Sequence, residues 1–469
     1  MLEGHTGLYT DMYELTMAQA YFREGTADTP AVFDYFFRKL PFGGGFVVFA
    51  GLADLLELIE GFRFSAADLD YLKTLGFASD FLEDLGRFRF RGAIYSAREG
   101  EIVFPLEPIV RVEGGLLETQ LVETALLNFL NFESLIATKA ARLRLAAGPR
   151  LLSEFGLRRS HGLGGIQASR AAVIGGCDTT SDVYAAWRYG LRPAGTMAHS
   201  YIESHAGELE AFRKFSEARP EGCIFLVDTY DTLRSGLPNA IRTAKEMEAR
   251  GEKPFAVRLD SGDLAYLAKQ ARRMLDEAGL GDVKIMASNL LDERVIRSLL
   301  AQGAPIDLFG VGTRLATGAP DGALDGVYKL AQAGGEPRLK LSENLAKTTL
   351  PGRKAIVRCS GADGRFEADA IVLEDEPDAA HMVHPIDPGK SLRLEGFDKE
   401  RLHVKVMEDG RRLGAPEPVE RIAGYARARL AALPEEHKRF ENPHIYKVGL
   451  SDRLAGMRDD LVRRFREEE

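Results

Sequence analysis

The sequence predicts an α/β fold, in which an irregular parallel α/β barrel is joined to an additional α+β domain. Between residues 223 and 309, apolar runs of strand length alternate with stretches of helix length, a spacing typical of βα units and of a parallel sheet. Strand-like runs broken by glycine and proline precede residue 125, and strand-like runs return after residue 350. The length of 469 residues suits two or three domains, at roughly 100–200 residues each.

These changes of pattern divide the chain into three segments. Residues 1–125 are expected to form the N-terminal α+β domain. Residues 126–350 are expected to form the α/β barrel, with the active site at the carboxyl ends of its strands. Residues 351–469, a β-rich segment followed by charged helices, are expected to pack on the N-terminal domain.

The elements of the two outer segments follow from residue spacing. Thr10 can cap a helix in which Met12, Leu15 and Met17 recur at rough helical spacing. Short apolar runs bounded by glycine and proline predict strands. The expected elements are helices over 10–24, 46–59 and 451–469, and strands over 31–40, 102–104, 109–112, 354–359, 368–373 and 401–407.

The central segment repeats one pattern, a buried apolar strand followed by a helical stretch. The expected strands cover 223–227, 255–259, 283–286 and 305–309. The expected helices cover 232–250, 264–278 and 292–302. Three βα units and a fourth strand indicate a parallel sheet, which we expect to close into a barrel.

Composition excludes several classes of protein. There are 61 basic and 70 acidic residues, a net charge of −9, which argues against non-specific nucleic-acid binding. The three cysteines are far apart and form neither a disulfide framework nor a zinc pattern. No signal peptide pattern opens the chain, and the longest apolar runs are too short to span a bilayer. We therefore expect a cytoplasmic protein without membrane or nucleic-acid partners.

Polar and glycine residues follow the predicted strands of the central segment. A turn over 195–200, which carries His199 and Thr196, likewise follows an apolar stretch. Functional sites of α/β sheets and barrels lie at the carboxyl ends of strands, so we expect these five ends to meet at one pocket. The other residues at these ends are Asp228, Arg258, Asp260, Ser288, Asn289, Gly310, Gly312 and Thr313.

Each of these residues has a functional and a structural interpretation. His199 can act as base, nucleophile or metal ligand, although a lone histidine in a turn is more often a surface or packing residue. Arg258 and Asp260 share one strand face, where they suit a phosphate and ribose hydroxyls or Mg²⁺, or form a structural ion pair. The turn at 261–263 can offer N–H groups to a phosphate, or its side chains can cap the next helix.

A second polar group lies upstream. Residues 155–159, Phe-Gly-Leu-Arg-Arg, precede glycine-rich turns at 162–165 and 175–181, a combination that suggests an anionic ligand. The sequence contains no Walker-type phosphate loop, no dinucleotide-binding glycine motif and no H-E-x-x-H motif.

Taken in order, these segments resemble nicotinate phosphoribosyltransferases, of the type II phosphoribosyltransferase group. The likeness covers nearly the whole chain. The matching segments are 10–17, 36–38, 41–52, 135–142, 175–181, 195–200, 257–264, 287–289, 310–313, 326–329 and 338–342.

The resemblance implies ATP-assisted transfer of phosphoribosyl from phosphoribosyl pyrophosphate (PRPP) to the ring nitrogen of nicotinate. The products, nicotinate mononucleotide and pyrophosphate, belong to NAD salvage. His199 matches a histidine that the family phosphorylates with ATP, and Asp228 matches the carboxylate that orients it. ATP and Mg²⁺ are the implied cofactors, with Mg²⁺ carried by the substrate phosphates and Asp260 as its candidate protein ligand.

Binding residues also carry over from the resemblance. Tyr13 matches an aromatic residue of the partner subunit, which implies a homodimer with the active site at the subunit interface and dimer contacts in residues 1–125. The nicotinate-binding residues are Tyr13, Phe155, Arg158, Asp178, Thr196 and Arg258. The residues that bind the phosphoribosyl group and its phosphates are Arg258, Asp260, Ser288, Asn289, Gly310, Gly312 and Thr313.

Other functions compete with this interpretation. Nicotinamide phosphoribosyltransferases share the Phe-Gly-x-Arg, Asp-Thr and Asp-Ser-Gly elements, but the N-terminal segment and length look more like the nicotinate enzymes. Quinolinate phosphoribosyltransferases are shorter and lack the segment around His199. A non-catalytic nucleotide-binding protein of the same fold is a further alternative, against which the intact His199, Asp228, Arg258 and Asp260 argue.

Overall fold

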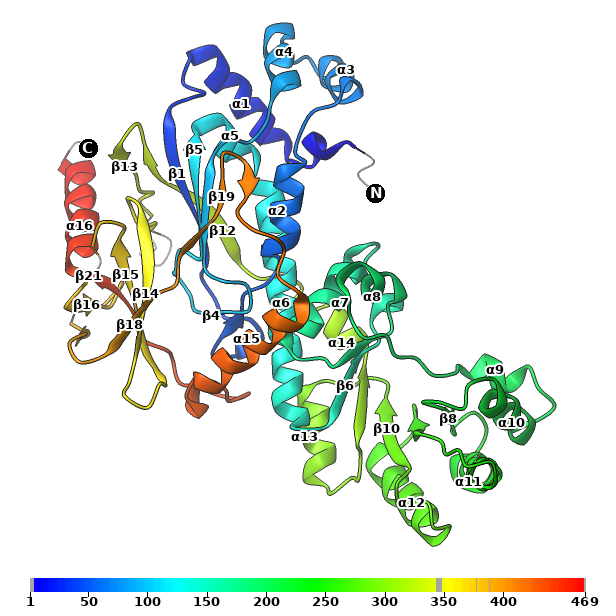
Figure 1. The fold of residues 1–469 in the computed structure, drawn as a ribbon. Coiled ribbons are helices and arrows are strands. Elements are labelled where there is room, and N and C mark those ends of the chain that lie inside the picture. Colours follow the sequence, from blue (N-terminus) through cyan, green and yellow to red (C-terminus); the bar gives the residue numbers. More distant parts are fainter. Residues whose placement is uncertain (1–3, 343–347, 377, 388, 468–469) are drawn as a thin grey trace. The chain divides into compact units, whose positions relative to one another are not determined.

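The computed structural model describes residues 4–342, 348–376, 378–387 and 389–467, drawn as a ribbon in Figure 1. The chain forms two compact units. The first unit combines Met1–Leu135 with Ala323–Glu469, and the second unit is Ile136–Gly322. Helix α6 (Glu123–Ala147) leads from the first unit into the second.

The second unit is built on a parallel sheet. Its strand order is β7-β6-β11-β10-β9-β8, and every neighbouring pair is parallel, which confirms a parallel α/β sheet. Within the described residues no ladder joins β7 to β8, so closure into a barrel stays a prediction. The strands are β6 (Leu151–Glu154), β7 (Thr179–Thr180), β8 (Ile224–Leu226), β9 (Ala256–Leu259), β10 (Lys284–Ser288) and β11 (Leu308–Val311).

The helices of this unit begin where side chains cap them and bury one apolar face. In α12, Asp263 accepts a hydrogen bond from the N–H of Tyr266 (3.0 Å), and Ala268, Ala271 and Leu275 are buried. The helices are α7 (Gly164–Gly175), α8 (Val183–Tyr189), α9 (His199–Glu203), α10 (Glu208–Ala218), α11 (Leu237–Ala249), α12 (Leu264–Glu277), α13 (Glu293–Ala301) and α14 (Thr313–Ala316).

Two larger sheets and one two-stranded sheet form the first unit, and the larger ones have strand orders β13-β12-β1-β5-β3-β19-β20 and β17-β16-β21-β15-β14-β18. The first of these combines strands from both ends of the chain, since β19 pairs with β3. The strands are β1 (Pro30–Phe37), β2 (Val47–Val48), β3 (Ala93–Ser96), β4 (Ile102–Val103), β5 (Val110–Gly115), β12 (Gly326–Ala333), β13 (Glu336–Pro337), β14 (Lys354–Ser360), β15 (Phe366–Leu373), β16 (His381–Val383), β17 (Ser391–Arg393), β18 (Asp398–Arg401), β19 (Val404–Glu408), β20 (Arg411–Arg412) and β21 (Val448–Ser451).

The structure corrects two predictions for the first unit. The predicted helix over 46–59 begins only at Leu52, because Val47 and Val48 pair with β4 as a short strand. The predicted strand over 401–407 is divided between β18 and β19, which belong to different sheets. Residues 468–469 of the predicted last helix lie outside the described residues. The helices are α1 (Met12–Glu24), α2 (Leu52–Glu60), α3 (Ala66–Thr74), α4 (Ser79–Arg87), α5 (Leu116–Leu121), α15 (Val419–Ala432) and α16 (Asp452–Glu467).

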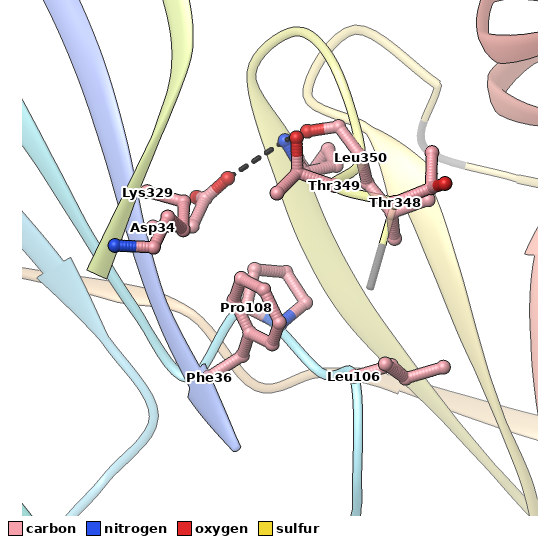
Figure 2. A pocket seen from close by; sticks show the side chains of 9 residues that line it. Asp34, Phe36, Leu106, Pro108, Lys329, Thr348, Thr349 and Leu350 are labelled. Carbon is pink, nitrogen blue, oxygen red and sulfur yellow. Dashed lines mark hydrogen bonds and ion pairs between the residues drawn. The ribbon is translucent and has the colours of Figure 1, made fainter. Parts of the chain in front are cut away.

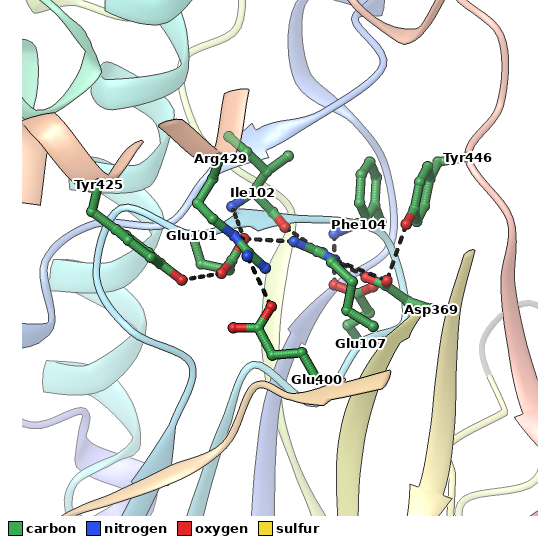
Figure 3. A network of polar contacts seen from close by, with 10 residues as sticks. Glu101, Ile102, Phe104, Glu107, Asp369, Glu400, Tyr425, Arg429 and Tyr446 are labelled. Atoms are coloured by element: carbon green, nitrogen blue, oxygen red, sulfur yellow. Dashed lines mark hydrogen bonds and ion pairs between the residues drawn. The ribbon is translucent and has the colours of Figure 1, made fainter. Parts of the chain in front are cut away.

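A buried ionic network connects the early and late parts of the first unit (Figure 3). Arg358 on β14 binds both carboxylate oxygens of Asp369 on β15 (2.9 and 2.6 Å), and it also binds Glu101 Oε1 (2.5 Å) and the Ile102 carbonyl (2.7 Å). Burial and the neighbouring Asp369 raise the pKa of Glu107 well above its ordinary value. The network therefore fixes the strands after residue 350 to the loop before residue 110.

No helix in the part of the chain that the structure describes has the length and apolar character needed to cross a membrane.

Candidate active site

The candidate site lies at the carboxyl edge of the parallel sheet in the second unit. Because β6, β8, β9, β10 and β11 are parallel, their carboxyl ends share this edge. The structure brings together side chains from the ends of β8, β9 and β10 and from the segment before α9. Hydrogen bonds and ion pairs within this group connect Thr196, His199, Asp228, Arg258, Asp260 and Ser288.

Arg258, on β9, is the centre of the group. Its guanidinium donates to Ser288 Oγ (2.9 Å), Thr196 Oγ1 (2.8 Å) and Asp260 Oδ1 (2.9 Å). It also lies over the ring of Phe155, 5.7 Å from the ring centroid. The Arg258 side chain is 12% exposed, so these partners hold it in a largely buried position. The predicted ion pair with Asp260 is therefore present, inside a larger cluster.

His199 and Asp228 form the second contact of the group. His199 Nε2 lies 3.3 Å from Asp228 Oδ1. The imidazole is 40% exposed, whereas the Asp228 carboxylate is 1% exposed. The buried carboxylate therefore contacts one ring nitrogen, and the remainder of the ring is accessible to a ligand.

The prediction that His199 follows a strand is wrong. Residues 191–194 make only an isolated parallel bridge between Pro193 and Thr180. His199 is instead the first residue of the short helix α9, with Ala198 as its N-cap. Hydrogen bonds from Arg258 to Thr196 Oγ1 and, at 3.5 Å, to the Met197 carbonyl attach this segment to the sheet edge.

Phe155 follows β6, and Gly310 leaves the space that its ring occupies. Its ring packs against an apolar group on the sheet, made up of Ile224, Ala256, Met286 and Leu308. A Cβ at Gly310 would lie 2.8 Å from the Phe155 ring, closer than side chains approach. Gly310 thus leaves space for the aromatic ring, a role different from the phosphate turn that the sequence suggests.

Other predicted residues surround the edge without joining the group. Asn289 is exposed in a left-handed conformation with φ of 76°, and Thr313 is the exposed first residue of α14. Arg158 is exposed on the 3-10 turn Leu157–Arg159. Among the contacts of the described residues, none joins these three side chains to Arg258 or Asp228. Gly312 is the N-cap of α14.

Asp178 and Tyr13 are not part of this hydrogen-bonded group. Asp178 accepts from the N–H of Leu152, near the amino end of β6 (2.8 Å), and pairs with Arg144. The structure therefore does not bring Asp178 to the carboxyl edge, and it gives this carboxylate a structural partner instead of a ligand. Tyr13 belongs to the first unit, on α1, and is 45% exposed.

Comparison with known proteins establishes the family. A protein of Bacillus subtilis named nicotinate phosphoribosyltransferase is 45% identical to this chain, over 95% of the chain and 93% of the relative. The chain belongs to the nicotinate phosphoribosyltransferase family. Family models agree: the N-terminal domain model of nicotinate phosphoribosyltransferase matches residues 8–131, the family model 151–372 and the C-terminal domain model 353–458.

Solved structures support the same fold. The crystal structure of human nicotinic acid phosphoribosyltransferase matches with a TM-score of 0.85 and 33% identity, covering 97% of this chain and 99% of that one. A nicotinate-nucleotide pyrophosphorylase from Pyrococcus furiosus matches with a TM-score of 0.72 and 25% identity, covering 92% and 96%. The mixed α/β fold that the sequence predicts is therefore shared with proteins of this family.

Two further residues support the site: Glu154, for which the sequence pattern predicted no role, and Ser261, for which it predicted only a part in a phosphate-binding turn or a helix cap. Glu154, at the end of β6, is buried and accepts hydrogen bonds from Ser169 Oγ (3.0 Å), Thr180 Oγ1 (2.6 Å) and the N–H of Gly156. It thereby fixes the turn that carries Phe155. Ser261 donates to Asp228 Oδ2 (2.5 Å). A carboxylate at the end of a short strand, directly before the Phe-Gly turn, was the available signal for Glu154.

The described side chains offer few ligands for a resident metal ion. In the described ranges, no group of three histidine, cysteine or acidic side chains could hold a metal ion. Asp260 Oδ1 accepts hydrogen bonds from Arg258 and Ser288, and its side chain is 24% exposed. One partly exposed carboxylate fits a cation that arrives with substrate phosphates, and it is too few ligands for a resident ion.

A small cavity in the first unit is separate from this site (Figure 2). Its lining includes Asp34, Lys354 and Thr348, and its volume is ≈ 20 Å³, about the space of one water. Asp34 Oδ2 pairs with Lys354 (2.7 Å), while Asp34 Oδ1 and Thr348 Oγ1 are buried without hydrogen-bond partners. The cavity suits a bridging water and is too small for a substrate.

Gly236 allows the strand end that carries Asp228 to take its position. A Cβ at Gly236 would lie 1.8 Å from the Val227 carbonyl oxygen. We expect Gly236→Ala to lower the free energy of unfolding by about 1–3 kcal/mol, because the backbone must move, and to reduce activity through Asp228. Chemical unfolding and turnover measure both effects. Gly207→Ala, with open space around its Cβ, is the control, and an unchanged Gly236→Ala protein would contradict the assignment.

Proposed function

We propose that this chain transfers the phosphoribosyl group of PRPP to the ring nitrogen of nicotinate, giving nicotinate mononucleotide and pyrophosphate in NAD salvage. We further propose that ATP hydrolysis drives the reaction through a phosphorylated His199. The observation that carries the proposal is the single group at the sheet edge in which Arg258 connects the His199 segment to Asp260 and Ser288. Family membership supports the same chemistry.

The transfer step needs binding and orientation more than a strong base. The pyridine nitrogen of nicotinate has its own lone pair, so it can attack the anomeric carbon as the bond to pyrophosphate breaks. In the proposal, Phe155 stacks on the pyridine ring and Arg258 attracts its carboxylate or the ribose phosphate. Asp260 receives the ribose hydroxyls, and Ser288, Asn289 and Thr313 surround the phosphate. Excluding water keeps the sugar cation from hydrolysis.

Mg²⁺, when bound with the phosphates, would neutralise charge on the leaving pyrophosphate. Asp260 is the residue that would hold it, as the partly exposed carboxylate of the group.

His199 has the arrangement of an activated nucleophile. Asp228 faces Nε2, so in the proposal Nε2 keeps its proton and Nδ1 keeps the lone pair. Nδ1 attacks the γ-phosphorus of ATP, the bond to the bridging oxygen breaks, and ADP leaves. Water later cleaves the phosphorus–nitrogen bond to give inorganic phosphate and free His199. While present, the phosphate adds negative charge and acceptors beside the donor site.

The proposal also covers the oligomeric state and the cellular location of the enzyme. A homodimer would supply Tyr13 of one subunit to the nicotinate site of the other, and the exposure of Tyr13 on α1 is compatible with that role. A cytoplasmic location is part of the same proposal, since Cys177, Cys223 and Cys359 are free thiols, as is usual in a reducing compartment.

Turnover with nicotinate and nicotinamide, measured side by side with PRPP and ATP, tests the proposed substrate. We expect nicotinate to have the higher kcat/KM and pyrophosphate to form in equal amount to the mononucleotide. A preference for the amide would favour the nicotinamide alternative, and binding of nucleotide without any transfer would favour a non-catalytic protein.

A further inference from the structure

Asp228 is held on the side away from His199 by a single turn. While Oδ1 faces the imidazole, Oδ2 accepts hydrogen bonds from Ser261 Oγ (2.5 Å) and from the N–H of Asp260 (3.0 Å). The Asp228 side chain is 1% exposed. A buried carboxylate needs donors to compensate for lost water, so these two bonds hold the orientation of Asp228.

Helix capping does not account for Ser261. The side chain that caps α12 is that of Asp263, which accepts from the N–H of Tyr266 (3.0 Å). The Ser261 hydroxyl instead donates to Asp228, which lies 33 residues earlier in the chain and just after β8. The cap and the Asp228 contact fix the turn at both ends, so the hydroxyl is positioned before any ligand binds.

We propose that Ser261 is a positioning residue for the phosphorylation of His199, acting through Asp228. Its hydroxyl holds Oδ2 so that Oδ1 stays aligned with Nε2, and this alignment leaves Nδ1 directed at the entering phosphorus. The inference rests on the proposed function and deepens it. It also connects the turn 260–263, where the donor is proposed to bind, to the histidine through one shared carboxylate.

The alternative is that Ser261 contacts the donor phosphates directly. The two roles can be distinguished in an assay that omits the phosphoribosyl donor PRPP. Labelling of the protein by ATP carrying a radioactive γ-phosphate, without PRPP or nicotinate, reports only on His199 and the groups that orient it. A direct phosphate ligand for PRPP would not alter that rate.

The experiment is a double-mutant cycle on the full-length protein, with the initial rate of acid-labile labelling as its readout. We expect Ser261→Ala to lower the rate about tenfold, the scale of one hydrogen bond to a charged group. Ser261→Thr keeps a hydroxyl and should restore most of the rate. In an Asp228→Asn background, Ser261→Ala should cause no further loss, because a residue that acts through Asp228 has nothing left to position. Thermal unfolding confirms that each variant is folded.

Several outcomes would overturn the inference. A labelling rate unchanged in Ser261→Ala would do so, and so would full additivity of the two substitutions. Failure of Ser261→Thr to restore the rate in a folded protein would also count against a hydroxyl donor. If the wild-type protein acquires no label at all, the proposed phosphohistidine is wrong and the inference is wrong with it. If the wild type is labelled and the Ser261→Ala variant is labelled equally, only the inference is rejected.

Discussion

Arg258→Ala is expected to lower kcat/KM for nicotinate by about 10²–10⁴-fold. The substitution removes donors to Thr196, Asp260 and Ser288 at once. Losing even two hydrogen bonds that involve a charge costs about 3–6 kcal/mol, and each 1.4 kcal/mol is tenfold. The substitution also removes the hydrogen bonds that hold the segment before His199. We therefore expect lower rates of both His199 phosphorylation and phosphoribosyl transfer. Steady-state kinetics with nicotinate and PRPP measure the loss.

Two controls make this result specific. Arg258→Lys keeps the charge but cannot bind three partners in a planar arrangement, so we expect only partial recovery. Arg273→Ala, on the exposed side of α12, should retain activity. Activity within threefold of wild type in Arg258→Ala would show that the group at the sheet edge is not the catalytic one.

Arg358→Ala is expected to lower the free energy of unfolding of the first unit by about 3–5 kcal/mol. Removing one member of a buried ion pair leaves the other uncompensated, and Asp369, fully buried with Arg358, would lose its bound guanidinium. Glu101, also fully buried, would lose this cation but keep Arg429 (2.8 Å). Because Arg358 also binds the Ile102 carbonyl, strands β14 and β15 should separate from the loop before β4. Chemical unfolding followed by circular dichroism measures the change.

Arg365→Ala is the matched control for Arg358→Ala. Arg365 pairs with Asp363 at 3.7 Å, but both side chains are more than half exposed. An exposed pair contributes about 0–1 kcal/mol, so this variant should unfold close to the wild-type midpoint. Equal effects of the two substitutions would contradict a structural role for the buried network.

Local pattern was enough to predict the part of the second unit between residues 223 and 309. The predicted strands at 223–227 and 255–259 coincide with β8 and β9, and the helix predicted over 264–278 is α12 almost to the residue. Apolar runs followed by helical stretches have few other ways to fold. Where long-range pairing decides, prediction failed: the apolar residues 47–48 pair with β4 instead of joining a helix, and residues 191–194 (Leu-Arg-Pro-Ala) form an isolated bridge and no strand.

The site was predictable in its strand ends and in the pairs His199–Asp228 and Arg258–Asp260, but not in the other contacts of Arg258. Asp228, Arg258, Asp260 and Ser288 were placed by their positions after strands. Arg258 contacts Thr196, which lies 62 residues earlier in the chain. This contact depends on how the chain returns to the sheet, and residue spacing gives no information about that return. Asp178 matched a family motif, yet its partner Arg144 comes from a preceding helix and holds it away from the edge.

The most direct test of the account is to locate the phosphate that ATP leaves on the protein. After brief incubation with ATP labelled in the γ-phosphate, the account predicts acid-labile label on His199, attached at Nδ1. That label should be absent in His199→Ala and should be lost from wild type when water completes the cycle. Phosphate on another residue, or ATP-coupled transfer that persists in His199→Ala, would contradict the account.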